Sequence, residues 1–282
     1  MEVEWQIMVL SRRRFIGAAA CAGSLRAQAA GIKKIDIHVH LGRDRQDMER
    51  VNSSNVGEHV KYLLAQMDSA GIEKSLIVPV EPLFPTRVYL EAAKLAPDRL
   101  IPACSVVPRP SHLAVDLLKA HHNAGARALK LQPLQYDPRD PMTERLIYEA
   151  VKLRMPVLFH FTDTPRAFPE MLEHVASTFA DGQFVVIHFG GVYGFESVLP
   201  LARLPNVWLE TSTAFVQVVN SPAREKLHFL KAERRLNKLI FGSEAPAHYA
   251  EVFGAIDSLV SGTDAAAAVY RKNAELILRL TS

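Results

Sequence analysis

The 282-residue sequence has little cysteine, no concentrated charge and no long apolar run. Its two cysteines, Cys21 and Cys104, are too few for a disulfide framework. A net charge of +3 without a block of like charges argues against electrostatic binding to nucleic acid. No stretch of 18 apolar residues predicts a transmembrane helix. No G-x-G-x-x-G or Walker A pattern predicts a nucleotide site.

The first 29 residues are typical of an export signal. The segment Ser11–Gly17 resembles the twin-arginine motif, a short apolar stretch runs to Leu25, and Ala27–Ala29 offers an A-x-A cleavage site. This order favours recognition by the twin-arginine translocation machinery and a periplasmic destination. A disordered basic tail is the alternative, and Met8 is a second possible start. We therefore place one folded domain at residues 30–282.

From residue 30 onwards, short runs rich in Ile and Val alternate with segments of helical periodicity. Segment 56–70 has apolar residues at helical spacing and is followed by Gly71, a typical helix end. Strands are expected at about 34–40, 74–79, 100–107, 127–131, 156–160, 184–188, 206–210 and 238–242. Later helices are expected to begin near Pro85, Ser111, Pro141, Pro165, Tyr193, Pro222 and Tyr249, with a last helix at about 263–280.

This alternation of eight strands with eight helices predicts an α/β fold, the (β/α)8 TIM barrel, which typically needs about 250 residues. A doubly wound open sheet is the structural alternative. That fold usually has fewer strands, and often a glycine-rich turn after the first one. Cys104 falls in an apolar run and is expected to be a small buried core residue.

Four of the eleven histidines lie where predicted strands end. His38 and His40 close the first strand, and residues two apart in a strand point to the same side. The fifth and sixth strands end in His160 and His188, and Glu244 follows the eighth. Because active sites of this barrel lie at the carboxyl ends of its strands, we expect these side chains to meet. Imidazoles with a carboxylate suit one divalent metal ion, with zinc as the first candidate. Hydrogen-bonded structural histidines are the alternative.

Two basic residues lie near the same predicted barrel mouth. Lys130 ends the fourth strand, and Arg43 follows the strand that carries the paired histidines. Lys130 could hold a substrate carboxylate as a single cation, and Arg43 could hold one through a bidentate pair. A solvated surface side chain is the alternative for each of them.

Five motifs resemble the amidohydrolase-related family, which includes aminocarboxymuconate-semialdehyde decarboxylase, resorcylate decarboxylases and several lactone hydrolases. The similarity runs in order across most of residues 33–280 and does not choose a substrate. The motifs are IDIHVHLG at Ile35–Gly42, MPVLFH at Met155–His160, VIHFGG at Val186–Gly191, LIFGSEAP at Leu239–Pro246, and Asn273-Ala274.

The resemblance implies that His38, His40 and His160 ligate one metal ion. It also implies that His188 contacts water or substrate beside that ion. Glu244 stands where the family usually has aspartate, in a GSD-x-P motif. Glutamate is longer by roughly 1.5 Å, which leaves three alternatives open. The pocket has adapted to the longer side chain, the metal is bound loosely or not at all, or the chain is a degenerate member.

The sequence thus predicts an exported metal-dependent hydrolase for a lactone, ester or amide bond in a small molecule, with or without a carboxylate group. Glu244 would accept a proton from water and return it to the leaving group, and His188 would stabilise the oxyanion. Non-oxidative decarboxylation and metal-independent lactone hydrolysis at the same site are the enzymatic alternatives. A non-catalytic periplasmic binding protein on the same barrel is the alternative from another class. Neither the substrate nor the oligomeric state follows from the sequence.

Overall fold

The structure is a computed structural model that describes residues 31–108, 111–132, 140–160, 167–232 and 235–280. The predicted export signal at residues 1–29 and the predicted helix start near Pro165 lie outside the described residues. Within the described ranges, no helix is both long enough and apolar enough to cross a membrane.

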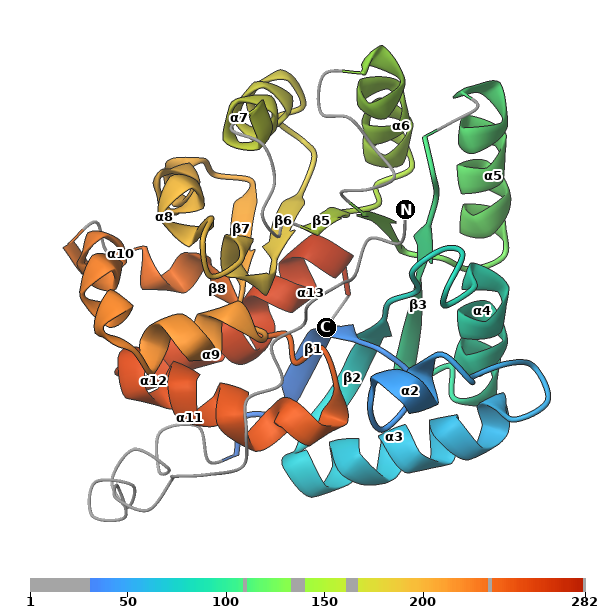
Figure 1. The fold of residues 1–282 in the computed structure, drawn as a ribbon, viewed down its shortest axis with the longest axis horizontal. Helices are drawn as coiled ribbons and strands as arrows, with labels where there is room; N and C mark the ends of the chain where they lie inside the picture. The colour runs from blue at the N-terminus through green and yellow to red at the C-terminus, as the bar shows by residue number, and fades with distance from the viewer. Residues whose placement is uncertain (1–30, 109–110, 133–139, 161–166, 233–234, 281–282) are drawn as a thin grey trace, which may run out of the picture.

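Eight parallel strands form one sheet in sequence order, which confirms the predicted (β/α)8 TIM barrel (Figure 1). Hydrogen bonds close the sheet on itself, because Ser243 N and Glu244 N donate to His38 O, at 3.1 and 2.7 Å. In the other direction His40 N donates to Glu244 O at 3.0 Å. The strands are β1 Lys34–Val39, β2 Ile72–Ile77, β3 Leu100–Ser105, β4 Ala128–Leu131, β5 Val157–His160, β6 Phe184–Ile187, β7 Val207–Glu210 and β8 Leu239–Ile240.

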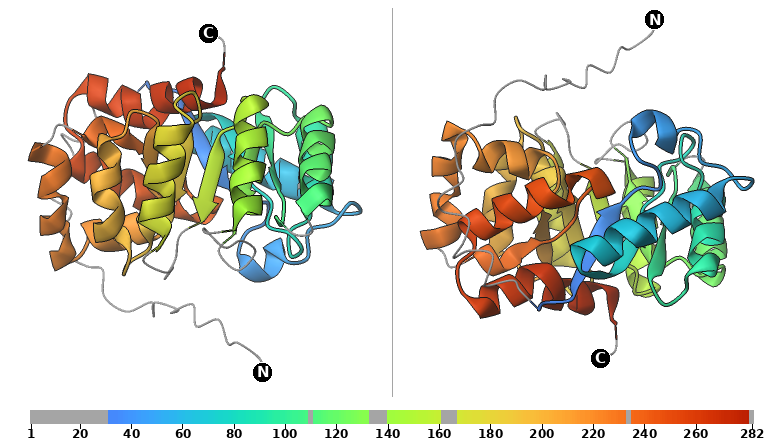
Figure 2. Two further views of the ribbon diagram at one scale, coloured as in Figure 1. Left: turned by 90° about the horizontal axis from the view of Figure 1, so that it is seen from above. Right: turned by 90° about the horizontal axis from the view of Figure 1, so that it is seen from below.

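Helices follow the strands and surround the sheet (Figure 1), and the two turned views show helices over its outer face from two sides (Figure 2). The α-helices are α2 Arg45–Met48, α3 Val56–Ala70, α4 Thr86–Leu95, α5 Ser111–Asn123, α6 Pro141–Lys152, α7 Ala167–Thr178, α8 Phe195–Val198, α9 Ala214–Val219, α10 His228–Ala232, α11 Tyr249–Leu259, α12 Thr263–Ala267 and α13 Asn273–Leu278. Shorter helical turns are η1 His188–Gly190, η2 Leu199–Arg203, η3 Pro222–Leu227, η4 Leu236–Lys238, η5 Pro246–His248 and the π-helical η6 Ala268–Lys272.

Two predicted helix boundaries are confirmed together with the chemistry that sets them. Helix α3 ends at Gly71, which takes the left-handed conformation with φ of 67° that glycine adopts without steric cost. Helix α6 begins after Asp140, whose side chain accepts a hydrogen bond from Met142 N, and Pro141 occupies the first turn.

The last part of the chain differs from the expected pattern. Strand β8 is only two residues long, because the chain after Ile240 pairs with β1 and bonds to the C-terminal helical segment. Phe241 N donates to Val269 O at 3.0 Å. That carbonyl lies in η6, the π turn that divides the single helix expected at 263–280 into α12 and α13. Helices α2 and α9 were not predicted.

Buried apolar side chains form two clusters, one inside the barrel and one between strands and helices. The outer cluster lies between the outward face of the strands and the helices. It includes Cys104, which is fully buried as predicted. Every strand contributes to the inner cluster, and α13 packs against it. Its buried members are Ile35, Ile37, Leu76, Val78, Ala103, Ala128, Leu158, Val185, Ile187, Trp208, Ile240, Ala274, Ile277 and Leu278.

An irregularity in β1 decides where its polar side chains point. The register of β1 against β2 shifts between Asp36 and Val39. Ile37 packs in the inner cluster, and the next residue, His38, also reaches inward, to 3.5 Å from Lys130 Nζ. A β-bulge explains how two consecutive residues face the same side. Asp36 instead accepts a hydrogen bond from Ser243 Oγ at 2.6 Å, in the segment that follows β8.

The buried Asn273 side chain joins α13 to the start of β8. Its Nδ2 donates to Asn237 O and Leu239 O, at 2.8 and 2.7 Å. We expect Asn273→Asp, which keeps the shape but loses both donors, to lower the free energy of unfolding by about 2–4 kcal/mol in urea titrations. The exposed Asn220 is the matched control, and Asn220→Asp should change this free energy by less than about 0.5 kcal/mol. Equal losses in both variants would contradict the role of the Asn273 bonds.

Candidate active site

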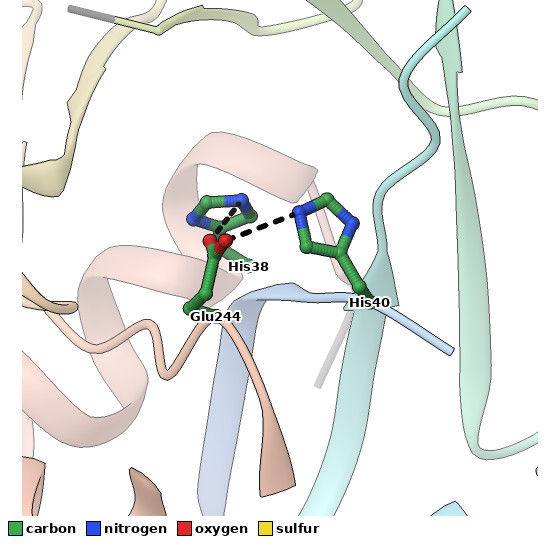
Figure 3. A group of neighbouring side chains, drawn as sticks. All are labelled: His38, His40 and Glu244. Carbon is green, nitrogen blue, oxygen red and sulfur yellow. Dashed lines mark ion pairs between the residues drawn. The ribbon is translucent and has the colours of Figure 1, made fainter. Parts of the chain in front are cut away.

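The carboxyl end of β1, the start of η1 after β6 and the segment after β8 bring three histidines to one carboxylate. His38 Nε2 lies 3.2 Å from Glu244 Oε2, and His40 Nε2 lies 3.6 Å from Glu244 Oε1 (Figure 3). His188 Nε2 lies 3.6 Å from Glu244 Oε2. The three rings are buried, whereas the Glu244 side chain is 24% exposed and so has access to solvent. The predicted meeting of His38, His40, His188 and Glu244 is seen in the structure.

Two of these residues have a backbone conformation that non-glycine residues seldom adopt. The φ angle is 69° at Glu244 and 56° at His188. Such residues persist where surrounding bonds hold them, and they concentrate at functional sites. Here the bonds to His38 and His40 across the barrel closure hold Glu244, and His188 N donates to Glu210 Oε2 at 2.7 Å.

The ring of His40 has a defined orientation. Its Nδ1 lies 2.5 Å from Val78 O, and because a carbonyl only accepts hydrogen bonds, Nδ1 carries the proton. The unprotonated Nε2 of the neutral ring then faces Glu244, which is itself an acceptor. Two acceptors that face each other without a proton are stabilised by a cation between them.

The surroundings of Glu244 Oε2 are a second indication that the site binds a metal ion. This atom is buried and has no hydrogen-bond donor among the described residues. Its separation of 3.2 Å from His38 Nε2, and that of 3.6 Å between Glu244 Oε1 and His40 Nε2, match those of atoms that share an ion at about 2.0–2.1 Å in tetrahedral geometry. The residues present therefore fit a divalent metal ion.

Burial sets the charges of the site. It lowers the pKa of His38 to about 3 and that of His188 to about 4, and it also lowers the pKa of His40 and His160. Neutral imidazole is the form that ligates a metal. Burial by itself raises the pKa of Glu244, but positive charge beside it, on His188, His40 or His38 when one of these rings holds a second proton and on the Lys130 ammonium, outweighs burial and brings this pKa well below its usual value. Glu244 is therefore a carboxylate.

Lys130 lies inside the barrel with the histidines. Its side chain is 1% exposed, and Nζ is 3.5 Å from His38 Nε2. The alternative of a solvated surface lysine is therefore wrong. Burial lowers the pKa of Lys130 to about 8, although Glu244 and Glu210 oppose this shift. A cation at this point can hold an anionic group of a ligand.

Two predicted site residues, Arg43 and His160, do not belong to the groups of donor atoms found among the described residues. Arg43 is exposed, and its guanidinium lies 5.2 Å from the centre of the Tyr62 ring. His160 stands beside His188, with ring centroids 4.6 Å apart. Among the described residues, His160 belongs to neither group of donor atoms that lie within 4.8 Å of one another. Metal binding by His160 and substrate binding by Arg43 stay predictions.

Glu210, at the end of β7, was not predicted. Its Oε2 accepts from His188 N at 2.7 Å and from Ser212 Oγ at 2.8 Å, and Oε1 accepts from Ser212 N at 2.6 Å. Burial raises its pKa to about 6, against the opposing effect of these donors and His188. Its position in the sequence could have marked it as a site residue, because Glu210 ends a predicted strand just as three of the histidines do.

The described residues offer two groups of potential metal donors that share His38. In the group of His38, His188 and Glu210, both carboxylate oxygens already accept hydrogen bonds. In the group of His38, His40 and Glu244, Oε2 of the carboxylate faces imidazole nitrogens without a donor. The second group is therefore the better metal site.

A family model described as Amidohydrolase matches residues 35–280. The chain belongs to the amidohydrolase family. This result confirms the resemblance noted in the sequence. A comparison with curated proteins found no match.

Solved structures similar to this amidohydrolase share its barrel at low identity. A probable 2-pyrone-4,6-dicarboxylic acid hydrolase of Acinetobacter baumannii is 16% identical, with a TM-score of 0.65 over 88% of this chain and 100% of the other. An uncharacterised TIM-barrel protein of Bordetella bronchiseptica is 20% identical, with a TM-score of 0.70 over 88% and 99%. A 2,6-dihydroxybenzoate decarboxylase of Rhizobium is 14% identical, with a TM-score of 0.62 over 88% and 99%.

Gly242 makes room for Glu210 in this amidohydrolase. A Cβ at position 242 would lie 2.7 Å from Glu210 Cγ and Cδ, and hydrogen bonds to His188 and Ser212 hold that carboxylate in place. We expect Gly242→Ala to lower the free energy of unfolding by about 1–3 kcal/mol. In Gly254→Ala, the control, a Cβ in α11 meets nothing within 4 Å, so this variant should gain about 0.5–1 kcal/mol. Urea unfolding measures both, and equal stabilities would contradict the fixed position of Glu210.

Proposed function

We propose that this amidohydrolase holds one divalent metal ion, with zinc as the first candidate, and hydrolyses a lactone, ester or amide bond in a small carboxylated molecule. The observation that carries the proposal is the approach of the buried His38 and His40 Nε2 atoms to the Glu244 carboxylate, whose Oε2 has no hydrogen-bond donor among the described residues. A structural role for these histidines would instead leave each facing nitrogen and oxygen with a hydrogen-bond partner.

His38, His40 and Glu244 would hold the ion, and the family resemblance adds His160. When bound, the ion polarises a carbonyl group and lowers the pKa of water. Glu244 would accept the proton that water releases and return it to the leaving group. Its carboxylate is ionised, so it has a free lone pair for the proton, and its side chain is partly exposed to solvent and so can meet water.

The position of Lys130 supports the proposal that the substrate carries a carboxylate. Its buried Nζ lies among the histidines, and within the described part of the chain no carboxylate is in hydrogen-bond contact with it, so this cation can bind the carboxylate of a ligand. Two similar structures bear the names of enzymes for carboxylated compounds, 2-pyrone-4,6-dicarboxylic acid and 2,6-dihydroxybenzoate. Arg43 is proposed as a second contact for the substrate, from the loop that follows β1.

Non-oxidative decarboxylation is the second candidate. It is favoured by the fold shared with 2,6-dihydroxybenzoate decarboxylase and by the same buried Lys130, which could hold the carboxylate that leaves. Release of CO2 without ring opening or hydrolysis would support this candidate over the first.

Substitutions of Glu244 and His38 test the proposed function. We expect Glu244→Gln to lower kcat about a hundredfold or more, because an amide cannot accept the proton. Glu244→Asp should lower it about tenfold or more, because the shorter side chain moves the base from its partners. His38→Ala should lose both stoichiometric metal and turnover. His174→Ala, which alters an exposed histidine on α7, is the control and should keep both.

Bound metal and turnover of a lactone and aryl ester panel are measured on the same preparations. Full activity in a metal-free protein would select the metal-independent lactonase. Ligand retention without turnover would select the binding protein. A Glu244→Asp variant that is faster than the original chain would show a degenerate site, and equal kcat for the original chain and Glu244→Gln would remove Glu244 from the mechanism.

We also propose that residues 1–29 direct export through the twin-arginine machinery to the periplasm. A double replacement of Arg12 and Arg13 by lysine should leave precursor in the cytoplasm, because the machinery recognises the arginine pair. Arg26→Lys, outside the motif, is the matched control and should be exported normally. N-terminal sequencing of the exported form should begin near Ala30. Normal export of the double variant would refute this proposal.

A further inference from the structure

The two nitrogens of the His188 ring have different surroundings. Nδ1 lies 2.9 Å from Ser212 Oγ and 3.1 Å from Thr213 Oγ1. Nε2 points the other way, to 3.6 Å from Glu244 Oε2. His188 is 5% exposed, and burial favours the neutral ring, which carries a proton on only one nitrogen. The neighbours of Nδ1 therefore decide which nitrogen that is.

Glu210 decides the direction of these hydrogen bonds. An ionised carboxylate only accepts, so Ser212 Oγ, 2.8 Å from Glu210 Oε2, gives its one proton to Glu210. The same oxygen then has only lone pairs left for His188, so Nδ1 must be the donor. Thr213 has a rotatable hydroxyl with no charged partner among the described residues, and it can accept from the same N–H.

We propose that Glu210 is a positioning residue that acts through Ser212 to keep the proton of His188 on Nδ1 and so presents an unprotonated Nε2 to the site. The inference refines the proposed hydrolysis and depends on it for its catalytic meaning. A neutral His188 of this form accepts a hydrogen bond from the attacking water and orients it. Stabilisation of the oxyanion by His188, as expected from the sequence, would require the opposite tautomer.

The other two rings have matching surroundings. His38 Nδ1 lies 3.5 Å from the same Glu210 Oε2, and His40 Nδ1 lies against Val78 O. Each of the three histidines thus has an acceptor beside Nδ1 and turns Nε2 toward Glu244. Carboxylates and carbonyls that take the second N–H of a histidine fix its ring at metal sites. The buried Glu210 carboxylate on β7 is therefore linked to the His188 ring through Ser212, and it lies near His38 Nδ1 without a hydrogen bond to it.

The tautomer can be measured directly on the full chain as purified, labelled with 15N-histidine. Long-range 1H–15N correlation spectra distinguish a proton on Nδ1 from one on Nε2, and a His188→Asn variant identifies the signals. We expect His188 to carry its proton on Nδ1. Ser212→Ala and Glu210→Gln should each move a measurable part of the population to Nε2–H, whereas Thr213→Ala, the matched control, removes a neighbour of Nδ1 that has no link to Glu210 and should leave the proton on Nδ1.

A proton on Nε2 in the original chain would overturn the inference. So would unchanged His188 spectra in both Ser212→Ala and Glu210→Gln, or a shift produced by Thr213→Ala alone. The spectra need no substrate, so a chain without turnover still reports the tautomer. Failure of the proposed hydrolysis and failure of this inference are therefore separate results.

Discussion

Hydrogen bonds between β1 and the segment after β8 both close the barrel and assemble the candidate site. His38 O accepts from Ser243 N and Glu244 N, and Glu244 O accepts from His40 N. The backbone that joins the two ends of the sheet thus belongs to the residues whose side chains meet. Because the barrel cannot close without this pairing, the separation of the His38, His40 and Glu244 side chains is fixed by the fold rather than by a flexible loop.

The candidate site is buried and contains neutral histidine rings around a small number of charged side chains. Glu244, Glu210 and Lys130 are its main ionisable neighbours, and burial raises the free energy of each charged form. The charge of Glu210 is compensated by three hydrogen-bond donors, which are the backbone N–H groups of His188 and Ser212 and the Ser212 hydroxyl. Glu244 Oε2 has no such donor among the residues that the structure describes; it faces imidazole nitrogens, and Lys130 attracts the carboxylate electrostatically. The difference between these two carboxylates separates a supporting group from one that can meet a metal ion and a substrate.

The strands and most helices could be predicted because apolar periodicity and end signals such as Gly71 are local. The four histidines followed from their place at strand ends, where the fold makes them meet. The bulge between Asp36 and Val39 and the π turn η6 could not be predicted, because both depend on bonds between distant segments, such as Phe241 N to Val269 O. Glu210 stands at a predicted strand end, but a single glutamate followed by Thr211 and Ser212 is also typical of the start of an ordinary loop.

The structure bears on the glutamate that stands where the resembled family usually has aspartate. The backbone at Glu244 has a φ of 69°, set by the pairing with β1, and its carboxylate spans His38, His40 and His188. A shorter side chain from the same Cα would end roughly 1.5 Å earlier, and the rings of His40 and His188 are held by Val78 and Ser212 and cannot follow it. The fixed histidines thus match glutamate rather than aspartate, which favours a pocket adapted to the longer residue over a degenerate one.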